Sequence, residues 1–429
     1  MQLNPNLSVR RALAAATCTL LGSAAQTSHA DSVDEPWRLD TSVLYYSEQN
    51  RVTVIEPVVF LRKAIGEDSF LNFRLVYDSM TGASANGATP TNKPQTFTSP
   101  SGTTSYTTPA GQTPLSPFHD QRIAIAAEWD KPVDRMSRTI YGINASAETD
   151  YTSFGLSAKF LQDFNDRLTT LTAGIAGSYD IVSPVGGAPT PLQLMSTVVP
   201  PPPGSEGEGE GGSGQTKIVT DAIIGVTQVL SRRALMQFNY SIGYSSGYLT
   251  DPYKVVSVID GTSGATLDYR YESRPDTRLR QSFYWETVYH LNQDVVHFSY
   301  RYFWDDWGIR ANTADLHYRL ELGKGSYLQP HLRYSVQSAA NFYVYNLVNT
   351  DPVPAYASAD YRLGDLTTTT IGLKFGMPVT PRSELSLRLE SITQSGDGHP
   401  ADGIGIQKNY DLFPTIKTAV AQITYTGRF

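Results

Sequence analysis

Residues 316–322 of the chain have the sequence Leu316-His317-Tyr318-Arg319-Leu320-Glu321-Leu322. Every second residue in this stretch is apolar, and every residue between is ionisable. A β-strand points alternate side chains to opposite faces, so the stretch predicts a strand with one apolar face and one charged face. The same alternation occurs at residues 71–75, 296–302, 371–375 and 385–390. The chain is therefore predicted to be an all-β protein.

Sixteen candidate strands follow this pattern along the chain. They lie near residues 37–47, 52–63, 69–78, 119–130, 138–148, 151–162, 167–179, 217–230, 234–245, 278–291, 294–304, 309–322, 326–337, 365–377, 384–394 and 416–429. Strands of this length are long enough to cross a bilayer at a tilt. Because the number of strands is even, both ends of the chain are expected on the same side of the membrane.

The connections between these strands are of two kinds. Most connections after even-numbered strands are tight turns, such as residues 323–325. Four connections after odd-numbered strands are long, and they span residues 79–118, 180–216, 246–277 and 338–364. An outer-membrane barrel separates short periplasmic turns from long external loops in this way, and a soluble sandwich has no reason to do so. We therefore predict a single antiparallel transmembrane β-barrel of about 16 strands, with short periplasmic turns and long extracellular loops.

The composition excludes a bundle of transmembrane helices. The 429 residues are 40% hydrophobic and 17% charged, and the mean hydropathy is −0.28. Beyond the N-terminus no apolar run reaches the length of about 18 residues that a membrane helix needs. Aromatic residues recur near predicted strand ends, where girdles at the membrane interfaces would use them. These residues are Trp37, Tyr45, Trp129, Trp285, Trp304 and Trp307.

The first thirty residues predict an exported protein. Arg10 and Arg11 precede an alanine-rich apolar segment, and Ser28-His29-Ala30 offers the small residues that a signal peptidase recognises. We therefore predict a cleavable signal peptide at 1–30 and the barrel at 31–429. The net charge of −7 becomes more negative after cleavage, which disfavours nucleic acid as a partner. The only cysteine is Cys18, so the mature chain would lack disulfides, Cys-ligated zinc and iron–sulfur centres.

The C-terminal strand carries a second signal for the outer membrane. Ala421, Ile423, Tyr425, Gly427 and Phe429 share one face, and the chain ends on the aromatic residue. This pattern resembles the signal by which the barrel assembly machinery recognises its substrates. The expected partners are thus outer-membrane lipid and that machinery, and the expected location is the outer membrane of a Gram-negative bacterium.

Ionisable side chains of both signs fall on the face opposite the lipid-facing one, so they are predicted to line the lumen. Two roles are open for them: a lattice of salt bridges that stiffens the wall, or a constriction of paired charges that sets selectivity. The candidates are Arg74, Arg280, Glu286, His297, Arg301, Asp315, His317, Arg319, Glu321, Arg333, Lys374, Arg388 and Glu390, together with Glu56, Arg62, His290, Asp305 and His331.

Four of these candidates are histidines on successive strands. They are His290, His297, His317 and His331. A metal site or a proton path is one interpretation, but their spacing matches no metal motif, so we predict hydrogen-bonded wall residues and no metal site. The chain also lacks G-x-S-x-G, H-E-x-x-H and P-loop motifs, and no catalytic residues are predicted.

Two segments share the pattern D-x-x-[ST]-G-A-[ST], at residues 78–84 and 260–266. The pattern resembles the acceptor sequence of exported redox proteins, in which a flavin transferase links FMN to the final Ser or Thr by a phosphoester. A flexible Gly-Ala turn would expose the hydroxyl of Ser84 or Thr266 to that reaction. Asp, Gly, Ser and Thr are also common turn formers, so the alternative is a pair of ordinary turns. No other feature requires a cofactor.

Longer stretches resemble a known family. Residues 300–309 have the sequence Tyr-Arg-Tyr-Phe-Trp-Asp-Asp-Trp-Gly-Ile, and residues 78–88, 272–278, 330–334 and 339–343 carry further matches. Together they resemble an uncharacterised family of bacterial outer-membrane proteins, domain of unknown function 3570. The resemblance covers nearly the whole mature chain and implies a fold and a compartment but no activity. It further implies that members are sometimes encoded near flavin transferases and small lipoproteins.

Three functions follow as hypotheses. The first is a channel or scaffold for the passage of a small polar solute or ion. The second is a flavin-bearing redox component that works with a flavin transferase and periplasmic redox proteins. The third is a surface adhesin built from the loops. The transported solute is not predicted by the sequence.

Overall fold

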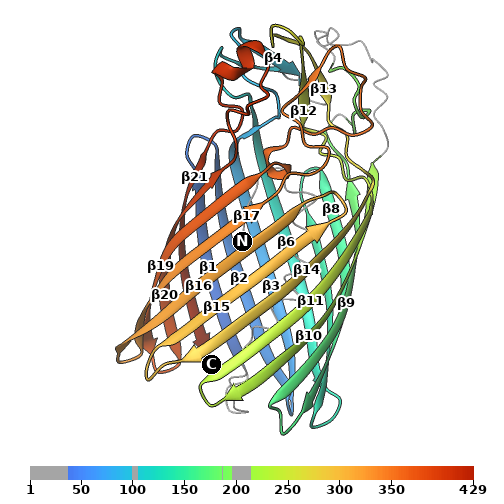
Figure 1. Cartoon of the computed structure of the whole chain (residues 1–429). Helices are drawn as coiled ribbons and strands as arrows, with labels where there is room; N and C mark the ends of the chain where they lie inside the picture. Colours follow the sequence, from blue (N-terminus) through green and yellow to red (C-terminus); the bar gives the residue numbers. More distant parts are fainter. Residues whose placement is uncertain (1–36, 99–104, 186, 196–213) are drawn as a thin grey trace.

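The computed structural model describes residues 37–98, 105–185, 187–195 and 214–429, and the predicted signal peptide lies outside these residues. Sixteen antiparallel strands close into one barrel, in which each strand pairs with its neighbour along the chain and β21 returns to pair with β1. Figure 1 shows the strands tilted around the barrel, with folded connections gathered at one end. The prediction of a sixteen-stranded transmembrane barrel is confirmed.

Every predicted barrel strand is present, with its ends shifted by a few residues. The barrel strands are β1 (Trp37–Glu48), β2 (Val52–Gly66), β3 (Ser69–Ala85), β6 (Leu115–Pro132), β7 (Ser137–Ala147), β8 (Tyr151–Phe164), β9 (Thr169–Val182), β10 (Gln215–Ser231), β11 (Ala234–Gly247), β14 (Thr277–His290), β15 (Val295–Asp305), β16 (Arg310–Gly323), β17 (Ser326–Gln337), β19 (Leu366–Thr380), β20 (Ser383–Ser395) and β21 (Ile416–Arg428).

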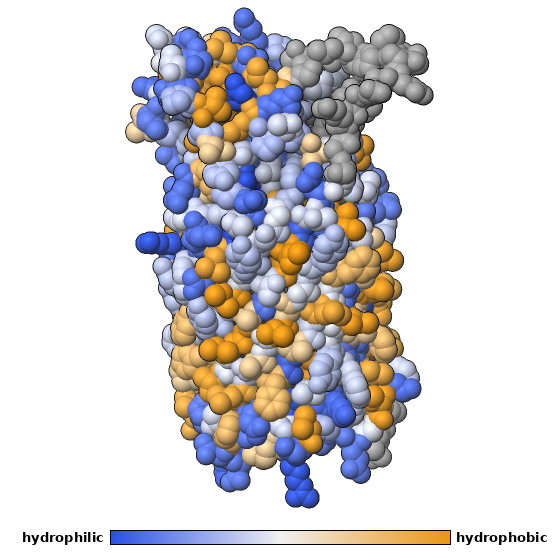
Figure 2. Space-filling model, turned by 90° about the vertical axis from the view of Figure 1, so that its right-hand side faces the viewer, coloured by the Kyte–Doolittle hydropathy of each residue, from blue (hydrophilic) through white to orange (hydrophobic). Residues whose placement is uncertain are grey.

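The alternation along the strands places apolar side chains outside the barrel. Ile143 and Leu156 on neighbouring strands are 60% and 67% exposed, as expected for side chains that face lipid. Apolar residues cover much of the barrel wall in Figure 2. Among the described residues, no helix is long and apolar enough to cross a bilayer.

A charge on this outer face is expected to be costly. Ile143 lies in the middle of β7, so Ile143→Arg would place a guanidinium near the centre of the bilayer. We expect the free energy of unfolding of the variant to be lower by about 2–4 kcal/mol. The measurement is unfolding by guanidinium chloride of the protein folded into lipid vesicles. The matched control is Asn144→Arg, which adds the same group on the inward face of the same strand. Equal losses for both variants would contradict the assignment of the two faces.

The long connections all lie at one end of the barrel, which we call the long-loop end. They join β3 to β6, β9 to β10, β11 to β14, β17 to β19 and β20 to β21. Two details differ from the prediction. The first loop is shorter than residues 79–118, because β3 and β6 continue their pairing as far as Ala85 and Leu115. A fifth long connection, 396–415, also reaches this end.

These connections contain structure of their own and form what we call the loop cap. Their elements are β4 (Gln95–Thr98), β5 (Ser105–Thr108), β12 (Val255–Ile259), β13 (Thr266–Tyr271), β18 (Asn346–Val348), and the short 3-10 helices η1 (Tyr361–Leu363) and η2 (Gly405–Asn409). β12 pairs with β13 and also with β18, so two of the long connections share one small sheet. The cap is visible above the barrel in Figure 1.

Trp307 corrects one prediction. It is only 5% exposed and therefore does not belong to an aromatic girdle at the membrane interface. It lies in the turn between β15 and β16 and packs in an apolar cluster with Leu249, Phe342 and Leu363 from the loop cap. The alternation of β15 does not extend into this turn, because the chain must reverse direction there. Trp37 and Trp129, at the short-turn end, are exposed as predicted.

Candidate functional site

The predicted lumen-lining residues lie on the inward faces of their strands. Asp315 shares a face with its register partner Arg333, as Lys374 does with Arg388. The alternating neighbours on the other face, such as Leu332 and Leu387, are exposed apolar residues of the outer wall, so the charged face is the inward one. The inward set is Arg74, Arg280, Glu286, His297, Arg301, Asp315, His317, Arg319, Glu321, Arg333, Lys374, Arg388 and Glu390, with Glu56, Arg62, His290, Asp305 and His331.

Three histidines form one row across the lumenal wall. His297 on β15 is the register partner of His317 on β16, and His317 is the register partner of His331 on β17. The imidazole rings of His317 and His331 are stacked, with centroids 4.0 Å apart and an angle of 12° between the planes. His290 lies apart from this row, at the end of β14, where it pairs with Val295.

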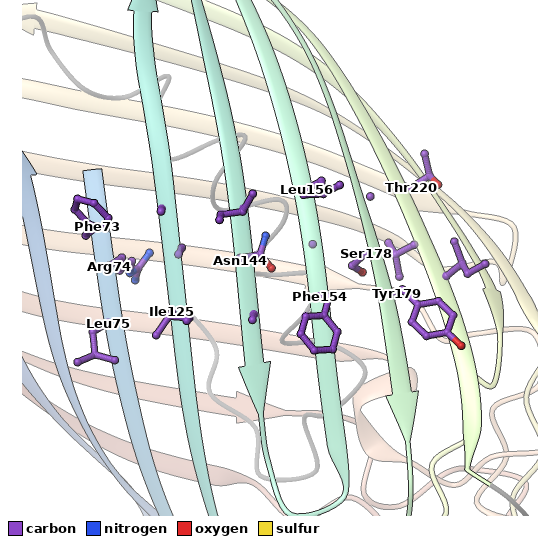
Figure 3. Close-up of a pocket in the computed structure, with 18 of the residues that line it drawn as sticks. Phe73, Arg74, Leu75, Ile125, Asn144, Phe154, Leu156, Ser178, Tyr179 and Thr220 are labelled. Atoms are coloured by element: carbon purple, nitrogen blue, oxygen red, sulfur yellow. The ribbon is translucent and has the colours of Figure 1, made fainter. Parts of the chain in front are cut away.

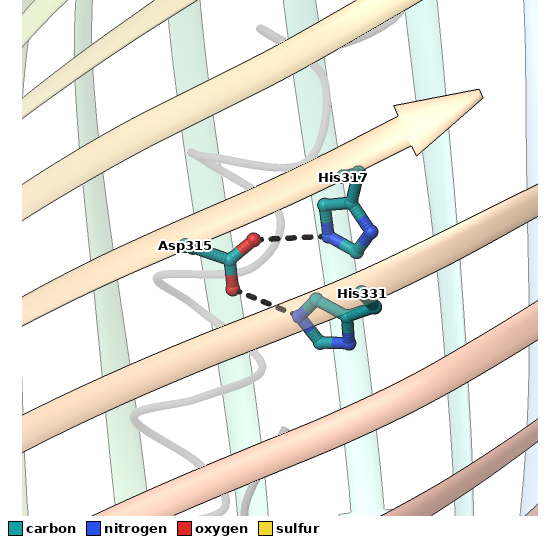
Figure 4. A group of neighbouring side chains, drawn as sticks. All are labelled: Asp315, His317 and His331. Carbon is teal, nitrogen blue, oxygen red and sulfur yellow. Dashed lines mark hydrogen bonds and ion pairs between the residues drawn. The ribbon is translucent and has the colours of Figure 1, made fainter. Parts of the chain in front are cut away.

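The carboxylate of Asp315 bridges the two stacked rings. Its Oδ1 lies 3.0 Å from Nε2 of His317, and its Oδ2 lies 3.2 Å from Nε2 of His331. Figure 4 shows both nitrogens directed at the same carboxylate. One acidic group and two imidazoles are thus held together by the pairing of only two strands.

The far side of His331 contacts a second carboxylate. Nδ1 of His331 lies 2.9 Å from Oε1 of Glu390, although β19 runs between their two strands. Gly372 is the register partner of both residues, and a Cβ atom at this position would come within 2.7 Å of Cγ of Glu390. The absence of a side chain at Gly372 therefore leaves the space in which histidine and glutamate meet.

Two arginines and a glutamate complete the charged belt around this row. Arg388 Nη1 lies 3.4 Å from Glu390 Oε1, and Arg333 Nη1 lies 4.0 Å from Asp315 Oδ2. His297 Nδ1 lies 3.6 Å from Glu286 Oε1. These side chains are partly exposed, so they face space inside the barrel rather than a packed core. Both open roles remain compatible with this belt, because the same ion pairs can brace the wall and narrow the lumen.

A second charged group lies in the loop cap and was not predicted. We call it the cap ionic cluster, and it consists of Asp251, Lys254, Glu272, Arg274, Asp360 and Arg362. Its members come from two long connections, 248–276 and 338–365. Lys254, Glu272 and Asp360 are each at most 1% exposed. Buried charges of this kind persist only where each one has partners, and here three acids face three bases.

The contacts of the cap ionic cluster join the two connections. Arg274 Nη2 donates to Asp360 Oδ2 at 2.9 Å, and Arg362 Nη2 donates to Asp251 Oδ2 at 3.0 Å. Burial alone would raise the pKa of Asp360, but the neighbouring Arg362, Lys254 and Arg274 hold that pKa well below its ordinary value of 3.8. Burial dominates at Glu272 and raises its pKa. The ion pairs of the cluster therefore hold connections 248–276 and 338–365 together.

Comparison with protein families identifies the chain. A family model described as "Protein of unknown function (DUF3570)" matches residues 10–427. The chain belongs to this family. The resemblance found in the sequence is thus confirmed over nearly the whole chain. Comparison of the DUF3570 chain with curated proteins finds no match.

Comparison with solved structures also finds matches at low similarity. A bacterial polysaccharide outer membrane secretin matches with a TM-score of 0.43 and 10% identity, over 93% of this chain and 100% of its own. A mutant ferric enterobactin receptor from Pseudomonas aeruginosa matches with a TM-score of 0.43 and 11% identity, over 91% of this chain and 59% of its own. OmpT, an outer membrane protein of Vibrio cholerae, matches with a TM-score of 0.37 and 8% identity, over 92% and 96%.

The two predicted flavin acceptors of this DUF3570 chain lie in unlike surroundings. Ser84 is 5% exposed and belongs to β3, where it pairs with Ser116 and lies 3.4 Å from Nζ of Lys254. The prediction of a flexible turn around Ser84 is therefore wrong, because β3 continues through this residue. Thr266 begins β13 directly after a turn, in which Asp260 accepts a hydrogen bond from the backbone N–H of Ser263. Flavin attachment at either residue stays a prediction.

An apolar hollow of about 1080 Å³ lies on the barrel wall of the DUF3570 chain across strands β2 to β10. Figure 3 shows Ile125, Phe154, Leu156 and Tyr179 along it. Ile125 and Leu156 are more than half exposed and belong to the outward faces of β6 and β8. The hollow therefore lies on the lipid-facing side of the wall.

Proposed function

We propose that this DUF3570 protein is an outer-membrane channel for a small polar solute or ion, which crosses the lumen past the histidine row. The observation that carries the proposal is the set of partly exposed charged pairs inside the barrel. The side chains of His317, Arg333 and Arg388 are 34%, 37% and 36% exposed. A wall of this kind keeps its charges hydrated and offers both signs to a passing solute.

The loop cap would control entry from the long-loop end. The cap ionic cluster ties connections 248–276 and 338–365 together, and its residues are buried rather than hydrated. A solute that enters at this end must pass beside the cap or wait until the loops separate. We therefore propose that the resting channel conducts weakly. The strength of the ion pairs in the cap ionic cluster would set how often the channel opens.

The outer membrane of a Gram-negative bacterium is the location that suits this channel. Ile423 and Phe429, on the predicted recognition face of the C-terminal strand, are 55% and 57% exposed. Exposed apolar residues there support recognition by the barrel assembly machinery and contact with lipid afterwards. The redox and adhesin hypotheses stay predictions, and we propose no catalytic role.

Conductance in planar bilayers tests the proposed function. The purified protein, folded in detergent micelles and shown to be folded by heat-modifiable migration on gels, is expected to give small stepwise currents. A barrel whose lumenal charges only stiffen its wall would give no current. Folded protein that stays silent both as wild type and after the cap ionic cluster has been weakened would overturn the channel proposal.

A further inference from the structure

Asp315, His317 and His331 place three potential metal-ligand atoms within 4.8 Å of one another. We propose that these three side chains bind one divalent transition-metal cation in the lumen. The proposal goes beyond passage of a solute, since the site would hold its ion whether or not the barrel conducts.

The distances between the ligand atoms suit a metal ion. Bonds of about 2.0–2.2 Å to nitrogen and oxygen place the ligands of a tetrahedral ion about 3.3–3.6 Å apart. In this structure the carboxylate oxygens of Asp315 lie 3.0 Å and 3.2 Å from the two Nε2 atoms. The two rings, which now lie nearly parallel, would have to turn out of their stack so that both Nε2 lone pairs point at the cation. The cation would then replace the hydrogen-bond proton between each nitrogen and the carboxylate.

The contact behind His331 supports the site independently. Metal-bound histidines usually donate their second ring N–H to a carboxylate, which orients the ring and raises its basicity. Nδ1 of His331 lies 2.9 Å from Glu390 Oε1, so the ring already has that support while its Nε2 faces Asp315. Gly372 makes the contact sterically feasible. The chain thus supplies both the ligands and the group that orients one of them.

The residue types define the class of metal. Two imidazoles with one carboxylate favour ions such as Zn²⁺, Ni²⁺, Cu²⁺ or Fe²⁺, whereas Mg²⁺ and Ca²⁺ prefer ligand sets made of oxygen alone. The side chains of His317 and Asp315 are 34% and 17% exposed, so water in the lumen can fill the remaining coordination positions. Arg333 stands 4.0 Å from Asp315 and is the cation that competes with the metal for this carboxylate.

Metal titration of the whole barrel tests the proposal. The untagged protein in detergent micelles, stripped with EDTA, is titrated with Zn²⁺ by calorimetry and with Co²⁺ by visible absorption spectroscopy. The wild type is expected to bind one ion per chain, with Co²⁺ bands typical of mixed nitrogen and oxygen ligands. The double variant His317→Gln/His331→Gln is expected to lose this site, whereas His290→Gln, on the same lumenal face outside the row, should keep it.

A second pair of variants tests the groups that orient the ring of His331 and leaves the metal ligands themselves in place. Glu390→Gln and Gly372→Val are expected to weaken Zn²⁺ binding roughly 10- to 100-fold while leaving the stoichiometry at one. Gel migration confirms that each variant is folded. Wild-type protein that binds no ion, or binding that survives in the double histidine variant, would overturn the proposed site. Neither result depends on conductance, so this test stands apart from that of the channel.

Discussion

Replacing Asp360 by asparagine is expected to open the loop cap and to raise the ionic current through the barrel several-fold. Asp360 is 1% exposed, and its carboxylate accepts hydrogen bonds from Arg274 Nη2 at 2.9 Å and from Arg362 Nε at 2.7 Å. Asparagine keeps the size of the side chain but removes its charge, so two buried guanidinium groups would face each other with less compensation. Removing one member of a buried ion pair typically costs about 3–5 kcal/mol. The two connections would relieve this cost by separating.

Single-channel recording and limited proteolysis measure this effect together. Asp360→Asn should conduct more than the wild type and should be cleaved faster within 248–276 or 338–365. The matched control is Asp351→Asn, which removes an exposed aspartate from the same connection and should change neither readout. Wild-type conductance in a folded Asp360→Asn protein would rule out the cap ionic cluster as the group that keeps the channel closed.

Mild acid is not expected to neutralise Asp360 itself. The pKa of Asp360 is held well below 3.8, because three neighbouring cations outweigh the effect of burial. For a carboxyl whose folded pKa is depressed, the stabilisation is present above the ordinary pKa and is lost as the pH falls through the folded one. The ion pairs of Asp360 with Arg274 and Arg362 should therefore persist from neutral pH down to mildly acidic conditions. Asp360→Asn therefore removes a stabilising charge that a pH change in this range does not remove.

The barrel could be predicted from the sequence because lipid and water impose opposite demands on alternate residues of each strand. The strands of the loop cap do not carry this signal. β12, with the sequence Val255-Val256-Ser257-Val258-Ile259, is buried along nearly its whole length and shows no alternation, so its sequence does not distinguish it from the rest of the loop. The cap ionic cluster was missed for a related reason. Its charges look like ordinary loop charges until the fold brings connections 248–276 and 338–365 together.

The histidine row marks the limit of prediction at the site. The strands of all three histidines were predicted, and so was the face on which each side chain lies. Their exact alignment depends on the pairing of β16 with β17, which contains a register shift between Glu321 and Gly323 beside the turn. An error of two residues in this register would keep His317 and His331 on the lumenal face and still separate them. The role of Gly372 is likewise visible only when β19 is placed between its neighbours.

Trp307→Ala is expected to be among the most destabilising single substitutions in the long-loop end. Trp307 is 5% exposed, its ring packs edge to face against Phe342 at 5.1 Å, and its Nε1 donates to the backbone oxygen of Thr277 at 2.9 Å. The guanidinium of Arg278 lies over the same ring, 4.3 Å from its centroid. Removing a buried tryptophan costs about 3–5 kcal/mol, because the packing is lost and a cavity remains.

The loss should fall first on the cap, because Trp307 joins the barrel turn to Leu249 and Phe342 of the two connections that the cap ionic cluster links. Guanidinium unfolding in lipid vesicles measures the free energy, and the rate of proteolysis within the cap reports local opening before the barrel unfolds. Trp304→Ala is the matched control, since Trp304 lies on the outward face of β15 and stacks on Tyr302 at 5.2 Å. Equal stability of the two variants would show that Trp307 does not anchor the cap. A larger loss at Trp307, with faster proteolysis, would mean that apolar packing and the ionic cluster hold the same loops closed by independent means.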